Sequence, residues 1–339
     1  EPSLLLPMGF GAILVNLPLS GAITQGTTVG PISALFDAGM SNELFPLLLF
    51  IGIGAMIDFG PLLEKPWLML FGAAAQFGIF VTLVLAGLFF DLPDAASIAV
   101  IGAADGPTAI FVANTLGSKY LGAIMVAAYS YMALVPIVQP PVIRLCTTKK
   151  ERLIRMPYQK GSVSKTTKIL FPIVVTMLAG LVAPASVALV GFLMFGNLLR
   201  ECGVLNALSE TAQNVLANLI TIVLGLTVAG QMTADKFVRP DTLLILALGL
   251  VAFIFDTVGG VFFAKLLNLF LPEGKKINPM IGAAGISAFP MSGRVVNQMG
   301  LAEDNQNFLL MYSISVNVSG QIASVIAGGL ILTLMSSCV

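Results

Sequence analysis

The sequence predicts an all-α protein that crosses a membrane several times. Three observations predict this class: 57% of the 339 residues are hydrophobic, only 10% are charged, and long apolar runs recur along the chain. A membrane-spanning helix needs about 20 consecutive, mostly apolar residues, and this composition is far from that of a soluble protein. The clearest of these runs are residues 67–90, 242–271 and 308–335.

Four short sequence matches recur between the two halves of the chain, in the same order and at offsets of 174 to 183 residues. Such a pattern is typical of an internal duplication. The sequence therefore predicts a first repeat at residues 1–143, a linker at 144–168 and a second repeat at 169–339. The matches pair Gly9–Asn16 with Gly191–Asn197, Lys65-Pro66 with Arg239-Pro240, Ile101–Ala104 with Ile281–Ala284, and Tyr129-Ser130 with Tyr312-Ser313.

Each repeat contains about five apolar segments. A further segment at about 169–183 leads into the second repeat, and its counterpart would be an N-terminal helix before Glu1, where this sequence starts without Met. The stretch 20–43 is expected to be a loop. The segments lie at about 4–19, 44–57, 67–90, 95–116 and 121–142 in the first repeat, and at about 186–199, 212–229, 242–271, 279–297 and 308–335 in the second.

Charge predicts how the segments are oriented. The linker from Arg144 to Lys168 carries eight Lys and Arg residues against one acid, Glu151. Positively charged loops stay on the cytoplasmic side of a membrane, so we expect this linker to be cytoplasmic. If the fourth segment of each repeat is a broken, re-entrant hairpin, the two repeats have opposite orientations. Such inverted repeats are typical of ion-coupled transporters, whose sites lie near the midplane where interrupted helices meet.

Several functions find no support in the composition. The net charge is zero and basic residues cluster only around the linker, which gives no indication of a nucleic-acid partner. The three cysteines, Cys146, Cys202 and Cys338, form neither a CxxC motif nor an evident pair, so we expect no disulfide or metal role. The chain has no histidine, so proton transfer falls to Asp, Tyr, Lys or water.

A carboxylate interrupts the fourth segment of the first repeat. Asp105 lies beside Gly106-Pro107, a pair that breaks a helix. A carboxylate near the middle of a bilayer costs roughly 3 kcal/mol, so a cation, a proton or an arginine must offset its charge. We therefore expect Asp105 to bind an ion rather than to form a purely structural pair. Asp256 is a second candidate, although no helix break accompanies it.

The matching segment of the second repeat ends on a cation. Gly282, Gly285 and Pro290 leave backbone carbonyls without helical partners, and such carbonyls are ligands for Na⁺. A kink that only packs is the alternative, since glycine is common in membrane helices. Arg294 closes the segment, and its guanidinium is a bidentate receptor for a carboxylate or a phosphate. Snorkelling to lipid headgroups is the alternative for this arginine.

Oxygen-bearing side chains that suit a hard cation lie on the same segments. Tyr129 and Tyr131 are two residues apart on a predicted helix, so at most one of them should point at the site. Hydrogen bonding between helices is the alternative role for any single member of this set. The other members are Thr108, Asn114, Ser130, Asn278, Ser287, Ser313, Ser315, Asn317 and Ser319.

Four motifs resemble one known family: GAADGPTAIF, AAYSYMALVPIVQPP, GNLLRECGV and NPMIGAAGISAFPMSGRV. They resemble the β subunit of the biotin-dependent, sodium-translocating decarboxylases that act on oxaloacetate, methylmalonyl-CoA or glutaconyl-CoA. The similarity runs from PMGFGAILVNLP to NVSGQIASVIAGG, which is nearly the whole chain. The resemblance implies a membrane subunit that decarboxylates carboxybiotin on a separate carrier protein, exports Na⁺ and consumes a proton.

The resemblance also implies site residues. The family's functional aspartate and tyrosine correspond to Asp105 and Tyr131, and its second motif corresponds to Asn278, Gly282, Ser287 and Arg294. Our hypothesis assigns catalysis to Arg294, Tyr131 and Asp105, and carboxybiotin binding to Arg294, Ser287, Asn278 and Gly282. It assigns Na⁺ binding to Asp105, Asn317, Asn278 and Ser287.

The implied partners are a carboxyltransferase (α) subunit, a biotin carrier and a small membrane-anchoring subunit of the γ or δ type. A homo-oligomer in the cytoplasmic membrane of a bacterium or archaeon is also expected. The short stretch Leu19–Asn42 and the segment SVNVSG at Ser315–Gly320 favour the CoA-ester branch of the family. The chain carries no MKM-like biotinylation site, so the carrier must be another chain. The alternative is a secondary Na⁺-coupled transporter or Na⁺/H⁺ antiporter on the same inverted-repeat scaffold.

Overall fold

The computed structural model describes residues 2–157, 161–237 and 239–336, and it confirms the all-α membrane class. It is 77% helical and has no β-strand among these residues. Six helical stretches within the described ranges are long and apolar enough to cross a membrane. They are η1–α5–α6 (Pro66–Ala86), α9 (Leu121–Cys146), α11 (Lys165–Val182), α13–η4–α14 (Asn206–Ala229), α16 (Pro240–Phe270) and α18 (Leu310–Ser336).

One group of helices packs on the side of the molecule that carries α3 (Leu44–Met56) and α12 (Val187–Glu201). These two helices pack closely because both have glycine at the contact. A Cβ atom on Gly54 would lie 1.8 Å from the Leu193 carbonyl oxygen, and one on Gly196 would lie 2.0 Å from the Ile51 carbonyl oxygen. Helix α11 packs on α12, and α1 (Pro2–Asn16) packs on α14 (Ala217–Ala229). We call α1, α3, α11, α12 and α14 the α3/α12 bundle.

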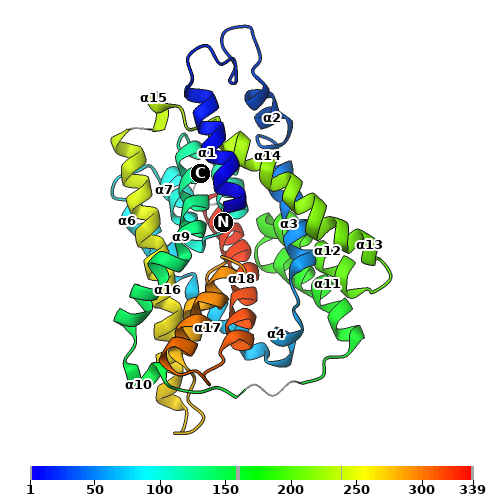
Figure 1. Ribbon diagram of the computed structural model, residues 1–339, viewed down its shortest axis with the longest axis vertical. Helices are drawn as coiled ribbons and strands as arrows, with labels where there is room; N and C mark the ends of the chain where they lie inside the picture. Colours follow the sequence, from blue (N-terminus) through cyan, green and yellow to red (C-terminus); the bar gives the residue numbers. More distant parts are fainter. Residues whose placement is uncertain (1, 158–160, 238, 337–339) are drawn as a thin grey trace.

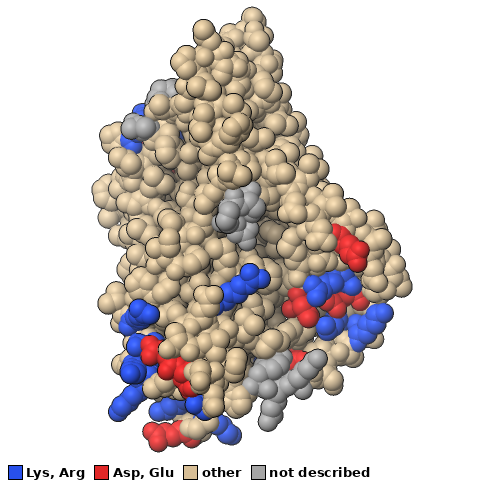
Figure 2. Space-filling view, viewed as in Figure 1, with Lys and Arg blue, Asp and Glu red and all other residues tan. Residues whose placement is uncertain are grey.

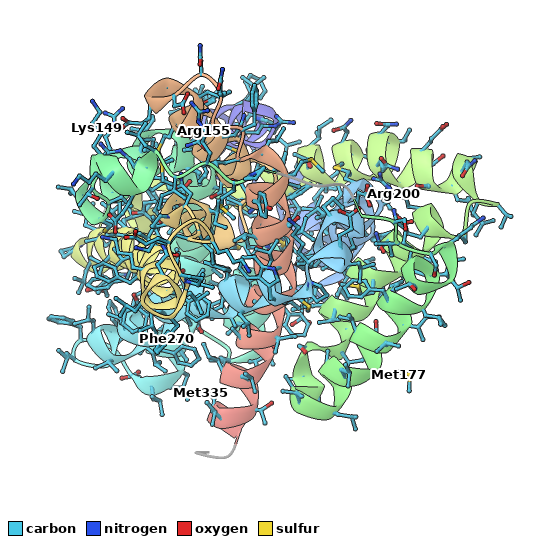
Figure 3. All side chains as sticks on the ribbon, turned by 90° about the horizontal axis from the view of Figure 1, so that it is seen from below. Lys149, Arg155, Met177, Arg200, Phe270 and Met335 are labelled. Atoms are coloured by element: carbon cyan, nitrogen blue, oxygen red, sulfur yellow. The ribbon has the colours of Figure 1, made fainter. Side chains whose placement is uncertain are left out.

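The second group surrounds α18. It contains α5 (Met69–Ala75), α6 (Phe77–Ala86), α7 (Leu92–Ala99), η2 (Val100–Ala103), α8 (Gly106–Thr115), α9, α16, η5 (Pro279–Gly285) and α17 (Met291–Glu303). We call this group, with α18, the interrupted-helix bundle. Seen from below, α18 lies between α9 and α16 on one side and α11 and α12 on the other (Figure 3).

Burial distinguishes the central helix from a peripheral one. The most apolar 18-residue window of α18 is 72% buried, whereas that of α11 is only 17% buried. Met177 on α11 lies at the outer edge of the molecule and is exposed (Figure 3). A largely apolar helix with so much exposed surface is suited to contact with lipid. The α3/α12 bundle is thus partly peripheral, while α18 is the centre of the packing.

The linker lies at the end of the molecule where charged side chains gather (Figure 2). Helix α9 continues to Cys146, so the linker begins slightly later than position 144, and it contains α10 (Lys149–Arg152). Arg152 Nε lies 2.7 Å from Glu303 Oε1, and Arg155 Nε lies 2.6 Å from Asp304 Oδ2. These ion pairs hold the start of the linker against the end of α17. Residues 158–160 lie outside the described residues.

Most predicted segments coincide with a helix, but the predicted loop at 20–43 is wrong in part. It contains α2 (Pro31–Gly39), which begins at a proline in the first helical position, where its missing N–H costs no hydrogen bond. Helices α2 and α3 are bent by 68° and together are apolar enough to form a further, broken span. The short helices α4 (Gly60–Glu64), η3 (Pro184–Ser186) and α15 (Ala234–Phe237) complete the fold. The inverted relation of the two halves and their boundaries stays a prediction.

Candidate functional site

Two interrupted helices meet inside the interrupted-helix bundle, whose helices α9, α16, α17 and α18 are labelled in Figure 1. The 3-10 turn η2 ends at Ala103 and is followed by Ala104, which has a left-handed backbone with φ of 52°, and α8 begins after an extended Asp105. The 3-10 turn η5 ends at Gly285, Ile286 is extended, and α17 begins at Met291 directly after Pro290. The Ser287 N–H donates a hydrogen bond of 3.0 Å to the Ala103 carbonyl. The two breaks predicted from the repeated IGAA motif are therefore bonded directly to each other.

Hydroxyl groups surround the carboxylate of Asp105. Thr108 Oγ1 donates to Asp105 Oδ2 at 2.6 Å, from the first turn of α8. Ser324 Oγ, on α18, lies 3.0 Å from the same oxygen and 3.1 Å from Ser287 Oγ. Asp105 is buried, and none of its described contacts is with a lysine or an arginine. A carboxylate with several neutral oxygens around it is the donor set that hard cations prefer.

Helix α18 holds the second break in place through its amide side chains. Asn317 Nδ2 donates to the carbonyls of Ala284, at 3.1 Å, and Ile286, at 2.7 Å. One turn later, Gln321 Nε2 donates to the Ser287 carbonyl. A break in a membrane helix leaves carbonyls that must find partners inside the protein, and α18 supplies them. Asn317 Oδ1 is buried without a hydrogen-bond partner.

A cavity of about 160 Å³ lies between the two bundles, next to this carboxylate. Liquid water occupies about 30 Å³ per molecule, so a cation with several waters would fit. The interrupted-helix bundle contributes the polar wall, which includes Asp105, Tyr129, Ser287 and Gln321. The α3/α12 bundle contributes a mostly apolar wall: Leu4, Leu49, Ile53, Met56, Ala217, Asn218 and Thr221.

The two tyrosines of the YSY motif face different sides of α9, as their spacing requires. Tyr129 lines the cavity, and its ring lies so close to Gly106 that a Cβ atom there would be 2.3 Å from the ring. Its buried hydroxyl has no hydrogen-bond partner. The Tyr131 hydroxyl donates instead to the Leu246 carbonyl on α16, and Tyr131 is not part of the cavity wall. The structure therefore places Tyr129, and not Tyr131, beside Asp105.

Asn278 and Gly282 do not line the cavity in this structure. Asn278 Oδ1 accepts from the Met280 N–H at 3.1 Å, and Nδ2 donates to the carbonyls of Arg152 and Ile154, each at 2.9 Å. These bonds join the linker to the start of η5. Gly282 lies against α16, where a Cβ atom would be 2.0 Å from the Gly260 carbonyl oxygen. Both residues thus position the second break, and neither contacts Asp105.

Arg294 is exposed in the first turns of α17. Within residues 2–157, 161–237 and 239–336 its guanidinium forms no ion pair. Pro290, one turn earlier, lines the cavity. Arg294 therefore lies near the cavity but outside its wall, with a guanidinium that is free for a carboxylate.

Sequence reasoning missed Ser324 and Gln321, which contact Asp105 and Ser287. A signal for both was present, because Asn317, Gln321 and Ser324 are spaced four and three residues apart. Residues with this spacing share one face of a helix. A polar stripe on an otherwise apolar membrane helix indicates a face turned toward a site.

Comparison with known proteins identifies the family. The sequence model of the Na⁺-transporting oxaloacetate decarboxylase beta subunit matches residues 1–335. The chain is 48% identical over 338 residues to the methylmalonyl-CoA decarboxylase subunit beta of Veillonella parvula, covering 99% of this chain and 88% of that protein. It is 45% identical over 391 residues to the oxaloacetate decarboxylase beta chain of Klebsiella pneumoniae, covering 98% and 90%. The chain therefore belongs to the Na⁺-transporting decarboxylase beta-subunit family and is a membrane subunit of a sodium-pumping decarboxylase.

Proposed function

We propose that this chain decarboxylates carboxybiotin carried by a separate protein and uses the reaction to export Na⁺, which binds at Asp105, Ser287 and Ser324. The observation that supports this site most strongly is that hydroxyl groups from α8 and α18 converge on one buried carboxylate, and the one from α18, Ser324, also contacts Ser287 Oγ at the second break. Thr108 is a further ligand. Desolvating a carboxylate without a partner is costly, and a bound Na⁺ offsets that cost.

Arg294 is the proposed receptor for the carboxylate of carboxybiotin. Its guanidinium is exposed and free of ion pairs among the described residues, and it follows Pro290 of the cavity wall by one helical turn. Planar guanidinium groups bind carboxylates through two parallel hydrogen bonds. Ser287 precedes this arginine by seven residues in the sequence and shares the cavity wall with Asp105. The carboxylated cofactor supplies the bond that breaks, and the protein orients it and excludes water.

Proton uptake is assigned to the tyrosine that faces the cavity. Tyr131 was the prediction from the family resemblance, but its hydroxyl is bonded to the Leu246 carbonyl. The Tyr129 hydroxyl has no partner and lies on the same cavity wall as Asp105. A general acid must be within hydrogen-bond reach of the group that it protonates, directly or through one water. We therefore assign this role to Tyr129, with Asp105 as the second participant.

Transport requires the site to face the two sides of the membrane in turn. The cavity lies where two separately packed helix bundles meet, and its polar groups come mainly from one of them. Rocking of one bundle against another around a fixed site is a common mechanism of ion-coupled transporters. We propose that the interrupted-helix bundle moves against the α3/α12 bundle and carries Asp105 and Ser287 with it.

The resemblance supports a multi-subunit assembly. We propose a carboxyltransferase subunit and a biotin carrier as partners, a small γ- or δ-type anchoring subunit, and a homo-oligomer in the cytoplasmic membrane with linker 144–168 on the cytoplasmic side. The alignment with the Veillonella parvula protein spans 338 residues, close to the 339 of this chain, whereas that with the Klebsiella pneumoniae protein spans 391. The shorter alignment supports the CoA-ester branch.

The test measures CO₂ release from a carboxybiotinylated carrier by the intact complex, with and without Na⁺. Asp105→Asn should abolish the Na⁺-stimulated release, whereas the matched control Asp91→Asn, at an exposed carboxylate, should retain it. In proteoliposomes, ²²Na⁺ uptake should require the carboxylated carrier. Equal uptake without the carrier would favour a secondary transporter instead, and full activity of Asp105→Asn would refute the proposed site.

A further inference from the structure

A second carboxylate is buried in the interrupted-helix bundle and takes no part in the proposed sodium site. Asp256 lies near the middle of the 31-residue helix α16 and is 1% exposed. It does not line the cavity that contains Asp105. A charged side chain at this depth of a membrane span is a functional candidate by default.

The two oxygens of Asp256 have different surroundings. Oδ1 accepts a hydrogen bond of 3.2 Å from the Ile79 N–H, in the first turn of α6, where the span Pro66–Ala86 is interrupted. Oδ2 is buried and has no hydrogen-bond partner. A Cβ atom on Gly102 would lie 2.9 Å from Oδ2. The unpartnered oxygen therefore lies against η2, three residues before Asp105.

Among the residues that the structure describes, no positive charge compensates this carboxylate. The elements α5, α6, η2 and η5 pack against α16 and contain no titratable residue. On α7, Asp94 accepts a hydrogen bond from Ser118 at 2.7 Å and lies 3.5 Å from Lys119. On α9, the Tyr131 hydroxyl donates to the Leu246 carbonyl, and Arg144 lies in the last turn.

The charged residues of α16 itself are also paired elsewhere. Lys265 lies 3.2 Å from Glu151, and Asp241 lies 3.8 Å from Arg239. An ionised Asp256 would therefore be a buried, unpaired anion with one free oxygen, which is the least favourable state for a carboxylate in a low-dielectric interior. The protonated form removes the charge, and it is the form that fits this packing.

We propose that Asp256 is a proton-binding site, separate from Asp105, that is protonated while η2 packs against α16 and releases its proton when η2 withdraws. Release transfers the proton from Oδ2 to water that enters beside Gly102, and the carboxylate that remains is solvated by that water. Because η2 and Asp105 belong to the same interrupted helix, the site links a proton to the position of the sodium-binding carboxylate. The inference adds a separation of η2 from α16 within the interrupted-helix bundle, and it rests on the proposed function only in that turnover drives this separation.

The test follows the protonation of Asp256 by infrared difference spectroscopy of the intact complex in lipid. The carbonyl stretch of a protonated carboxylic acid is assigned to Asp256 by its loss in Asp256→Asn. We expect this band at neutral pH in the resting, Na⁺-free complex, and we expect it to decrease when Na⁺ and carboxylated carrier start turnover. A band of constant intensity in both states would overturn the proposal, because Asp256 would then be a permanently neutral structural residue. The absence of the band from both states would overturn it as well.

Turnover gives an independent readout. Asn at position 256 keeps an oxygen that can accept from the Ile79 N–H but has no proton to exchange. We expect Asp256→Asn to lower Na⁺-dependent turnover at least about tenfold and to flatten its dependence on pH. Wild-type turnover with a wild-type pH profile would contradict the proposal.

A second variant covers the case in which Asp256→Asn does not fold. Gly102→Ala places a methyl group against Oδ2, so the Asp256 band is then identified as the carboxylic acid band that this substitution shifts. A spectrum in which no carboxylic acid band shifts would refute the contact on which the inference rests. The matched spectrum of Asp105→Asn separates this inference from the sodium site. The Asp256 band should persist there in the resting complex even if Na⁺ binding is lost.

Discussion

Asp105 and Asp256 are two buried carboxylates in one helix bundle, and their surroundings differ in kind. Asp105 lies in a helix interruption and accepts a hydrogen bond from the start of α8. Asp256 lies in the continuous helix α16 and accepts a hydrogen bond from the start of α6, where a neighbouring span is interrupted. Asp105 accepts hydrogen bonds from the hydroxyls of Thr108 and Ser324, and Ser324 Oγ also contacts Ser287 Oγ. Asp256 accepts hydrogen bonds from backbone N–H groups at the start of α6, and its Oδ2 has no partner.

The difference shows that burial alone does not identify a cation site. Hard cations require several oxygen ligands around one charge, and only Asp105 has them. A carboxylate without such ligands is neutral unless another charge balances it. Within this bundle, the number of nearby oxygen donors therefore separates a proposed sodium site from a proposed proton site.

The largest expected effect is that of Asp105→Asn. The amide keeps the volume and one acceptor oxygen but removes the charge that holds Na⁺. We expect Na⁺-dependent CO₂ release to fall at least about 100-fold, which corresponds to roughly 3 kcal/mol. The measurement is the initial rate of CO₂ release at saturating carrier. A residual rate above a tenth of the wild-type rate would contradict the assignment of Asp105, in contrast to Asp256, as the sodium ligand.

Removing one hydroxyl of the Asp105 site should have a smaller effect. Ser324→Ala deletes a single neutral ligand and leaves the carboxylate in place. We expect the Na⁺ concentration for half-maximal rate to rise about tenfold, or about 1.4 kcal/mol. Ser315→Ala is the matched control, because its buried hydroxyl donates to the Met311 carbonyl of its own helix. Equal effects of the two variants would argue against Ser324 as a ligand.

The tyrosine pair tests the same contrast between partnered and unpartnered groups. Tyr131→Phe removes the donor to the Leu246 carbonyl and should lower the free energy of unfolding by about 1 kcal/mol, with little effect on turnover. Tyr129→Phe removes a hydroxyl that has no hydrogen-bond partner. The free energy of unfolding should therefore stay unchanged, while turnover falls several-fold. Thermal unfolding in detergent and turnover of both variants check this prediction, and the reverse pattern would favour Tyr131 at the site.

The smallest effect is expected at a carboxylate outside the membrane spans. The hydrogen bond from Arg155 lowers the pKa of Asp304 below its ordinary value. A carboxyl with a lowered folded-state pKa stabilises the fold above its ordinary value, about 3.9, and loses that contribution as the pH falls through the folded-state value. Arg155→Ala should therefore reduce the difference in melting temperature between neutral pH and acid. An unchanged difference would show that this pair contributes nothing to the attachment of the linker.

The sequence predicted the helical segments because each is a long apolar run bounded by charge, glycine or proline. It also predicted the two breaks, because Gly106-Pro107 and Pro290 cannot continue a regular membrane helix. It did not predict that Ser287 N–H would bond to Ala103 O. That contact is between residues far apart in the chain, and no local pattern carries it. The helix α2 was missed because its flanks are rich in turn residues and its apolar run is short.

The charged residues of the candidate site could be predicted from the sequence, and among its neutral residues Ser287 could be predicted but Ser324 and Gln321 were missed. Asp105 stands out because a carboxylate is rare in an apolar span. Ser324 does not, since serine commonly hydrogen bonds within membrane helices, and only the position of α18 gives it a ligand role. Asn278 was assigned to the site from its oxygen-bearing side chain and from the family resemblance, and its side chain is bonded to the linker in the structure. The choice between Tyr129 and Tyr131 required the rotation of α9, which spacing alone does not fix.

The most direct measurement is a density map of the complex at high resolution, obtained in saturating Na⁺ and again without Na⁺. If two interrupted helices build the cation site, Na⁺-dependent density should appear within coordination distance of Asp105 Oδ2, Ser287 Oγ and Ser324 Oγ, and it should be absent from Asp105→Asn. Ion density confined to another part of the membrane span, with these three oxygens unchanged between the two maps, would contradict the account.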